Sequence, residues 1–221
     1  MRVSVRLFAV LRERAGAGEL ELELPEGALV RDALARVDGL ASDVPVVMAV
    51  NRNYAARDAV LHAGDELALI PPVSGGSGRT EESAQWGGSP HVRVTREPLA
   101  LDPLLQRVRH PAAGALVTFL GVTREVELLE YEAYAEMAEL QMAEIVGQAI
   151  DRHGLCSAAA EHRIGVVLLS EPSVAVAVSA AHRGPAFAGA REIIDQIKAR
   201  APIWKKEQGE WVRGVTPGAT G

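Results

Sequence analysis

The chain has 221 residues, of which 48% are hydrophobic and 24% are charged, and its formal net charge is -6. This length allows one or two domains with cores of their own, and the acidic balance argues against a general nucleic-acid binder. The single cysteine, Cys156, excludes an intramolecular disulfide framework and a cysteine-rich metal site. With no leader pattern and no apolar stretch that could span a bilayer, the protein is expected to be cytoplasmic and not bound to membranes.

The first part of the chain carries patterns that predict a small α+β unit. Val3, Val5 and Leu7 alternate with other residues, as in a half-buried strand. Helical spacing of apolar residues begins at Val30, and Gly39 is expected to stop that helix. The predicted strands cover residues 2–10, 19–24, 46–50 and 66–70. Two strands, a helix and two more strands are typical of a sheet covered by one helix.

A segment rich in glycine, serine and charged residues separates this unit from the rest of the chain. It runs from Ser74 to Pro90, and we assign residues 77–90 to a flexible linker. A second mixed α+β domain is predicted at 91–215, with a disordered tail at 216–221. Its predicted strands are 92–95, 115–120, 128–134, 164–169 and 174–180, with short closing strands at Trp204 and Trp211–Val212. Its predicted helices are 102–108, 137–150 and one that starts at Pro185.

Lysine is confined to one region of the chain. Of 23 basic residues only three are lysines, namely Lys198, Lys205 and Lys206. The lysine ammonium can lose its proton and act as a nucleophile, whereas arginine stays charged. Lysines gathered in a chain that otherwise avoids them therefore indicate proton-transfer or nucleophilic chemistry. The plainer alternative is a solvated basic turn at the end of a helix.

The first unit ends in a strand, a proline pair and then Gly75 and Gly76. A glycine backbone can enter a channel too narrow for any Cβ, although most Gly-Gly pairs are turns or linkers. With the opening RLFAVLRERAG and the closing GDELALIPPVSGG, residues 1–76 resemble the ubiquitin-like sulfur carriers, specifically the small subunit of molybdopterin synthase. The resemblance implies a β-grasp (ubiquitin-like) sulfur-carrier domain. Its terminal glycine, here Gly76, would be adenylated and converted to a thiocarboxylate that donates sulfur.

The second domain resembles the large, catalytic subunit of the same enzyme. The matching stretches are ALVTFLGVTRE, EHRIGVVLLSEPSVAVAVSAAHRGPAF and IKARAPIWKKE. The resemblance implies a mixed α/β-hammerhead-type domain and an α+β fold class for the whole chain. It also implies a sulfurtransferase of molybdenum cofactor biosynthesis that acts on cyclic pyranopterin monophosphate. The substrate would receive two sulfurs, one from each of two carriers, to form the dithiolene of molybdopterin.

The same resemblance implies a set of site residues. Lys198 is the candidate for proton transfer or for transient covalent contact with the carrier's carbonyl, and Lys205 is the candidate for binding the pterin and stabilising charge. A phosphate-bearing substrate and a thiocarboxylate are both negative, so cationic groups are needed between them. The candidates for substrate binding are Val122, Thr123, Arg124, His182, Arg183, Lys206 and Glu207.

Simpler interpretations remain for several of these residues. Arg124 could form a surface ion pair with Glu125 or Glu127, and His182 could be a hydrogen-bonded residue at a strand end. The residues interpreted as structural, as exposed or as part of the core are His110, His153, His162, Trp204 and Trp211.

Cofactors and partners are also expectations from the resemblance. It implies that this step needs no metal or nucleotide, because ATP is used by a separate adenylating and sulfurating enzyme that acts on the carrier glycine. The large subunits of the family are dimeric, so self-association as a dimer is expected.

The chain departs from the family pattern because Gly76 is followed by Ser77, so that its carbonyl is an amide and cannot become a thiocarboxylate. One hypothesis is cleavage after Gly76, in a polar segment of the kind where nicking concentrates. A second is that the fused N-terminal domain is a structural or interaction module and a free carrier supplies sulfur in trans. A third is that the whole chain is an anion-binding module without catalysis.

Overall fold

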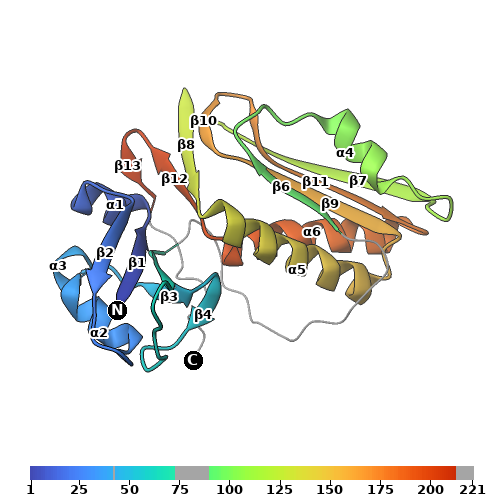
Figure 1. The fold of residues 1–221 in the computed structure, drawn as a ribbon. Coiled ribbons are helices and arrows are strands. Elements are labelled where there is room, and N and C mark those ends of the chain that lie inside the picture. Colours follow the sequence, from blue (N-terminus) through green and yellow to red (C-terminus); the bar gives the residue numbers. More distant parts are fainter. Residues whose placement is uncertain (42, 73–89, 213–221) are drawn as a thin grey trace.

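In the computed structural model, the described residues are 1–41, 43–72 and 90–212. Three sheets organise them, one five-stranded sheet near the N-terminus and two four-stranded sheets in the remainder (Figure 1). Gly75, Gly76, the expected tail at 216–221 and all of the expected linker except Pro90 lie outside the described residues. Within those described ranges, no helix is both long enough and apolar enough to cross a membrane.

The N-terminal sheet is mixed and has the strand order β2-β1-β5-β3-β4. Its strands are β1 (Arg2–Leu7), β2 (Glu19–Glu23), β3 (Val47–Val50), β4 (Asn53–Ala55) and β5 (Glu66–Ile70). The helices beside it are α1 (Ala9–Ala15), α2 (Val30–Arg36) and α3 (Asp38–Ala41). β1 pairs antiparallel with β2 and parallel with β5, and its residues Val3 and Val5 pack with Val30 and Ala33 of α2 in one core.

Two predictions for this unit are wrong. The strand expected over 2–10 ends at Leu7, because Phe8 is followed by Ala9 with a φ of +48° and the chain turns into α1. Ala9 is buried, so it continues the apolar alternation of β1 although it belongs to a helix. Gly39 does not stop α2, which ends at Arg36. Gly39 lies inside the short helix α3.

The remainder of the chain forms two sheets and three helices. One sheet has the order β6-β9-β11-β7 and the other β10-β8-β12-β13. The strands are β6 (His91–Thr95), β7 (Ala115–Val122), β8 (Leu128–Ala133), β9 (Ser157–Arg163), β10 (Gly165–Leu168), β11 (Pro172–Ala180), β12 (Ile203–Glu207) and β13 (Glu210–Trp211). The helices are α4 (Leu101–Val108), α5 (Ala135–His153) and α6 (Arg183–Arg200).

Helices cover both faces of the β6-β9-β11-β7 sheet. The long helices α5 and α6 lie along one face, and the short helix α4 lies on the other (Figure 1). Along β11, Val176 faces the core shared with α5 and α6, whereas Ala175 and Ala177 face Leu104 of α4. Successive strand residues point to opposite faces, which explains why nearly every residue of β11 is buried.

Strand β9 was not predicted from the sequence. Its segment Ser157–Arg163 reads SAAAEHR, and it carries none of the β-branched or large aromatic residues that favour strands. Its strand conformation comes from pairing with β11 on one side and β6 on the other. The helix expected to start at Pro185 begins two residues earlier, at Arg183, after His182 in an extended conformation. The α+β fold class is confirmed.

A third hydrophobic cluster joins the N-terminal sheet to the second part of the chain. The ring of Phe8 stacks on Tyr134 and on Trp204, with ring centroids 5.0 and 5.1 Å apart. Ala68 and Ile70 of β5 are buried in the same cluster. The N-terminal unit is therefore docked on the start of α5 and on β12, on the same chain.

Candidate functional site

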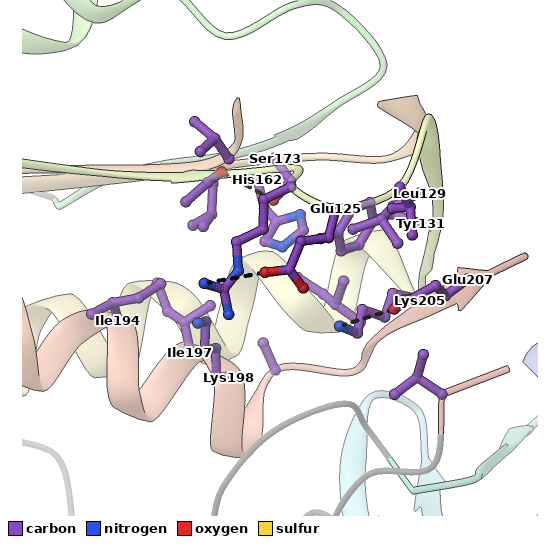
Figure 2. A pocket seen from close by; sticks show the side chains of 18 residues that line it. Glu125, Leu129, Tyr131, His162, Ser173, Ile194, Ile197, Lys198, Lys205 and Glu207 are labelled. Carbon is purple, nitrogen blue, oxygen red and sulfur yellow. Dashed lines mark hydrogen bonds and ion pairs between the residues drawn. The ribbon is translucent and has the colours of Figure 1, made fainter. Parts of the chain in front are cut away.

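The largest concentration of predicted site residues lies around a cavity of about 520 Å³ (Figure 2). Its walls come from the ends of β7 and β9, from β8, from the last turn of α6 and from β12. The polar and charged side chains that line it are Arg124, Glu125, Tyr131, His162, Ser173, Lys198, Lys205 and Glu207. A cavity of this size suits a small molecule.

The two lysines predicted to be catalytic both line this cavity. Lys198 lies in the last turn of α6, where the partial negative charge of the helix end favours a cation. The helix stops at Arg200, and Pro202 leads the chain directly into β12. Lys205 on β12 then points into the cavity, and its Nζ lies 3.9 Å from a carboxylate oxygen of Glu207 (Figure 2). A short connection between two elements thus places both ammonium groups around one space.

Lys206 lies on the other face of β12. Its ammonium pairs with Glu13 of α1, and its Nζ lies 5.3 Å from the ring centre of Trp211. Strand alternation explains this, since Lys205 and Glu207 share the cavity face. Lys206 therefore contacts the N-terminal unit and does not line the cavity.

The turn after β7 presents Arg124 to the cavity. Val122 also lines the cavity, but Thr123 is buried beneath the turn, where its backbone N–H donates to the carbonyl of Glu171 at 3.0 Å. Arg124 lies 3.9 Å from Glu125, and both side chains are more than three-quarters exposed. This is the ion pair that the simpler interpretation expected. Such an exposed pair is weak, so it leaves the guanidinium available to an anion.

His182 and Arg183 lie away from the cavity within one chain. They stand at the N-terminal end of α6, whereas Lys198 is in its last turn. At 1.5 Å per residue, the helix separates Arg183 from Lys198 by about 22 Å. The structure thus gathers Val122, Arg124 and Glu207 with the two lysines predicted to be catalytic, and leaves the His182–Arg183 pair elsewhere.

The cavity is also lined by residues that were not predicted from the sequence as functional, among them His162, Tyr131 and Ser173. His162 is 7% exposed, and burial lowers the pKa of its imidazole to about 4, an effect to which the charge of Lys198 adds. Tyr131 packs edge-on against this ring at 5.2 Å between ring centroids, and burial raises its pKa. Ser173 donates a hydrogen bond to the carbonyl of Gly121 at 3.2 Å. His162 lies at the end of the unpredicted strand β9, which is why spacing alone could not assign it to the site.

The last described residues of the N-terminal unit contact β12, which also forms part of the cavity wall. The indole Nε1 of Trp204 donates a buried hydrogen bond of 3.0 Å to the carbonyl of Pro71. Trp204 immediately precedes Lys205 on β12, and Val212, near the end of the described chain, lines the cavity as well. Pro71 therefore contacts β12 on the face opposite the one that Lys205 and Glu207 present to the cavity.

The chain matches two protein families. Residues 94–200 match the MoaE protein family and residues 5–76 match the ThiS family. The molybdopterin synthase catalytic subunit of Thermoplasma volcanium is 46% identical over 123 residues, which are 53% of this chain and 90% of that protein. The corresponding subunit of Coccidioides immitis is 40% identical over 134 residues, which are 54% of this chain and 68% of that protein.

Solved structures of related proteins are also similar to the second part of this chain. Molybdopterin synthase from Staphylococcus aureus has a TM-score of 0.51 at 34% identity and covers 56% of this chain and 93% of its own. Molybdopterin cofactor biosynthesis protein E from Burkholderia multivorans has a TM-score of 0.54 at 34% identity and covers 58% of this chain and 91% of its own. The family resemblance found in the sequence is confirmed: the chain belongs to the MoaE protein family, whose relatives are molybdopterin synthase catalytic subunits, and it carries a ThiS family domain in the same polypeptide.

Proposed function

We propose that this protein transfers sulfur from a thiocarboxylate at Gly76, freed by cleavage after that residue, to cyclic pyranopterin monophosphate held in the cavity. Membership of the MoaE protein family supports a role in molybdenum cofactor biosynthesis. The observation that carries the proposal is a hydrogen bond to the carbonyl of Pro71. Its donor is Trp204, the residue before Lys205 on β12. The N-terminal unit thus contacts the strand whose opposite face presents Lys205 to the cavity.

The proposed transfer uses the segment that follows Pro72. Gly76 is the fourth residue after Pro72, and an extended chain of four residues spans at most about 14 Å. Glycine at the last two positions adds no Cβ to the width of the tail. The proposal therefore requires Lys198 and Lys205 to lie within that span of Pro72 when the carrier glycine is engaged.

The cavity suits two anionic reactants. Arg124, Lys198 and Lys205 line it, and preorganised cations lower the cost of bringing a thiocarboxylate to a phosphate-bearing substrate. In the proposed division of roles, Lys198 exchanges a proton or contacts the carrier carbonyl, while Lys205 holds the pterin and stabilises developing charge. In each transfer the thiocarboxylate sulfur bonds to a substrate carbon in place of an oxygen, and water cleaves the resulting thioester, which leaves a carboxylate on the carrier glycine. Two such transfers complete the dithiolene. No metal, nucleotide or other cofactor takes part in the proposed step.

Mass spectrometry of the protein from its native cell tests the cleavage. The expected result is a fragment that ends at Gly76, part of which carries one sulfur in place of oxygen. If active preparations contain only the full-length chain, the proposed cleavage is wrong. Production of that fragment would also supply the free carboxylate that an adenylating and sulfurating enzyme needs.

Substitution of Lys198 tests the catalytic part. Lys198→Ala should abolish formation of the dithiolene product, and Lys198→Arg should restore charge but not turnover, because arginine cannot release its proton. Arg191→Ala is the control, since Arg191 is an exposed residue of the same helix. If Lys198→Ala weakened ligand binding and no turnover existed in the unsubstituted chain, the anion-binding module would be the correct function.

The main alternative is that a free carrier works in trans. It is favoured by Ser77, which makes Gly76 an internal residue of the translated chain. Replacing Gly75 and Gly76 by alanine separates the two ideas. Under the proposal the variant loses activity that depends on its own carrier domain, whereas under the alternative it stays fully active once a separate carrier is supplied.

The proposed assembly is a dimer. A cavity could receive His182 and Arg183 only from a second copy, because α6 holds its own pair about 22 Å from Lys198. His182→Ala would then lower activity without changing the cavity of its own chain. Mixing this variant with inactive Lys198→Ala should restore part of the activity, since one site of the mixed dimer would be complete.

A further inference from the structure

His162 is a buried imidazole with a fixed tautomer in the wall of the cavity. Its Nδ1 lies 2.8 Å from the backbone carbonyl oxygen of Arg163. A carbonyl oxygen can only accept, so Nδ1 carries the proton and donates it. The T-shaped contact with Tyr131, at an interplanar angle of 67°, holds the plane of the ring. The orientation of His162 is therefore set by its own strand and by β8.

The other ring nitrogen of His162 is left as an acceptor. With a pKa of about 4 the ring is neutral at neutral pH, so that Nε2 carries a lone pair and no proton. Among the hydrogen bonds of the described residues, none reaches this nitrogen. Figure 2 shows the ring on the sheet side of the cavity, while Lys198 and Lys205 approach from α6 and β12. The site thus offers a neutral acceptor on one side and cations on the other.

A ligand that fits both sides of the cavity has anionic groups and also hydrogen-bond donors. The cations match the anionic phosphate and the thiocarboxylate. A neutral acceptor in the cavity wall matches an N–H or O–H donor of the ligand, because a polar atom that a ligand covers without a partner is costly. A reduced pterin heterocycle carries such N–H donors on its edge. Lys205 was assigned to the pterin from the sequence, but its ammonium only donates and cannot accept a hydrogen bond from those N–H groups.

We propose that Nε2 of His162 accepts a hydrogen bond from a ring N–H of the pterin heterocycle, and that this bond orients the heterocycle between the sheet and the two lysines. The proposal rests on the proposed function for its substrate class. It assigns His162 to substrate binding and orientation, with no exchange of its proton.

Three variants of the full chain test this assignment. His162→Asn keeps a donor toward the carbonyl of Arg163 but does not reach the cavity, and His162→Leu removes both groups. His162→Gln can place an amide oxygen where Nε2 lies. Loss of one hydrogen bond should raise the dissociation constant of cyclic pyranopterin monophosphate about 3- to 10-fold for the Asn and Leu variants. The Gln variant should recover most of the affinity.

Inorganic phosphate is the control ligand, because it lacks the heterocycle. Its binding should be the same in the unsubstituted chain and in His162→Asn. Equal weakening of phosphate and substrate would overturn the proposal, since it would mean that the substitution disturbs the cavity as a whole. Unchanged substrate binding in both the Asn and Leu variants would overturn it as well.

A measurement on the unsubstituted chain does not depend on the folding of any variant. When the substrate is added, the ¹⁵N resonance of Nε2 in His162 should move in the direction of a nitrogen that accepts a hydrogen bond. If the substrate binds and this resonance stays in place, His162 has no such role while the proposed function stands. If the substrate does not bind at all, it is the proposed function that fails.

Discussion

At the scale of single residues, neighbours in the sequence have separate tasks. Lys205 lines the cavity, whereas Lys206 pairs with Glu13 on the opposite face of β12. Under the proposed function, Lys205→Ala should lower the rate of dithiolene formation about 100-fold or more, as removal of a preorganised charge-stabilising group does elsewhere. The free energy of unfolding should change little, because Lys205 is partly exposed and its contact with Glu207 is long.

Lys206→Ala is the matched comparison on the same strand. It should reduce the free energy of unfolding of the full chain by about 1 kcal/mol or less, because the ion pair with Glu13 is partly exposed. Denaturant unfolding and single-turnover kinetics of the two variants give both quantities. A larger loss of rate in Lys206→Ala than in Lys205→Ala would contradict the assignment of the two faces.

The buried imidazole of His162 makes stability depend on pH. Its pKa is about 4 in the folded chain and about 6.5 when exposed. Below pH 6.5 the unfolded chain binds a proton that the folded chain excludes, so the free energy of unfolding should fall as the pH drops toward 4, by at most about 3 kcal/mol. Above pH 6.5 this residue adds no pH dependence.

The His162→Gln variant lacks the pH-dependent part of the unfolding free energy that comes from His162, because glutamine does not titrate. The difference in unfolding free energy between the unsubstituted chain and the variant should shrink between pH 7 and pH 4. Parallel stability curves over that range would show that the imidazole is not held neutral by the fold.

At the scale of elements, Gly114 and Gly147 differ in the space around their Cα atoms. Gly114 precedes β7, and a Cβ there would lie 2.5 Å from the backbone carbonyl oxygen of Ala181. Gly147 lies within α5, and a Cβ there would meet nothing within 4 Å. The first glycine is required by the close approach of two backbone segments, and the second is not.

We therefore predict opposite signs for the two alanine substitutions. Gly114→Ala should lower the free energy of unfolding by about 1–3 kcal/mol, since backbone atoms must move to relieve the overlap. Gly147→Ala should raise it by about 0.5–1 kcal/mol, because alanine loses less conformational freedom in a helix. Thermal unfolding of both variants is the measurement, and equal effects would contradict the described approach of Gly114 to Ala181.

At the scale of the whole molecule, the docking of the N-terminal unit depends on one aromatic group. Phe8 stacks between Tyr134 and Trp204 and is 4% exposed. The hydroxyl of Tyr134 donates to Glu66 of β5, and burial raises the pKa of Tyr134 to about 12. Arg12 also pairs with Glu132 of β8 at 2.9 Å. Apolar stacking and polar contacts thus hold the N-terminal unit against β8, β12 and the start of α5.

Phe8→Ala should uncouple the two parts of the chain. Removing a buried phenylalanine costs about 3–5 kcal/mol, and here both lost stacking contacts, to Tyr134 and Trp204, join the N-terminal unit to the second part of the chain. Denaturant unfolding should separate into two transitions, and under the proposed function dithiolene formation should slow because the N-terminal unit is no longer held in place. Leu140→Ala, an exposed change on α5, is the control and should alter stability by less than about 0.5 kcal/mol. A single unshifted transition in Phe8→Ala would refute this description of the interface.

Most helices and strands, the α+β class and the family could be predicted from the amino-acid sequence alone. Periodicity located β5 at Glu66–Ile70 without error and β7, α4 and β11 to within two residues, because each strand or helix buries one regular face. The motif IKARAPIWKKE identified Lys198, Lys205 and Glu207, and all three line one cavity. Local sequence carries this information because spacing along one element sets which side chains share a face.

The remaining features depend on contacts between elements that are far apart in the sequence. Strand β9 forms because β6 and β11 pair with an alanine-rich segment, and that pairing brings His162 to the cavity wall. Helix α6 separates His182 and Arg183 from Lys198 although the same motifs carry all three. The docking of Phe8 onto Trp204 joins positions almost 200 residues apart. Such contacts depend on which surfaces meet after the elements have formed, and no spacing in the sequence records them.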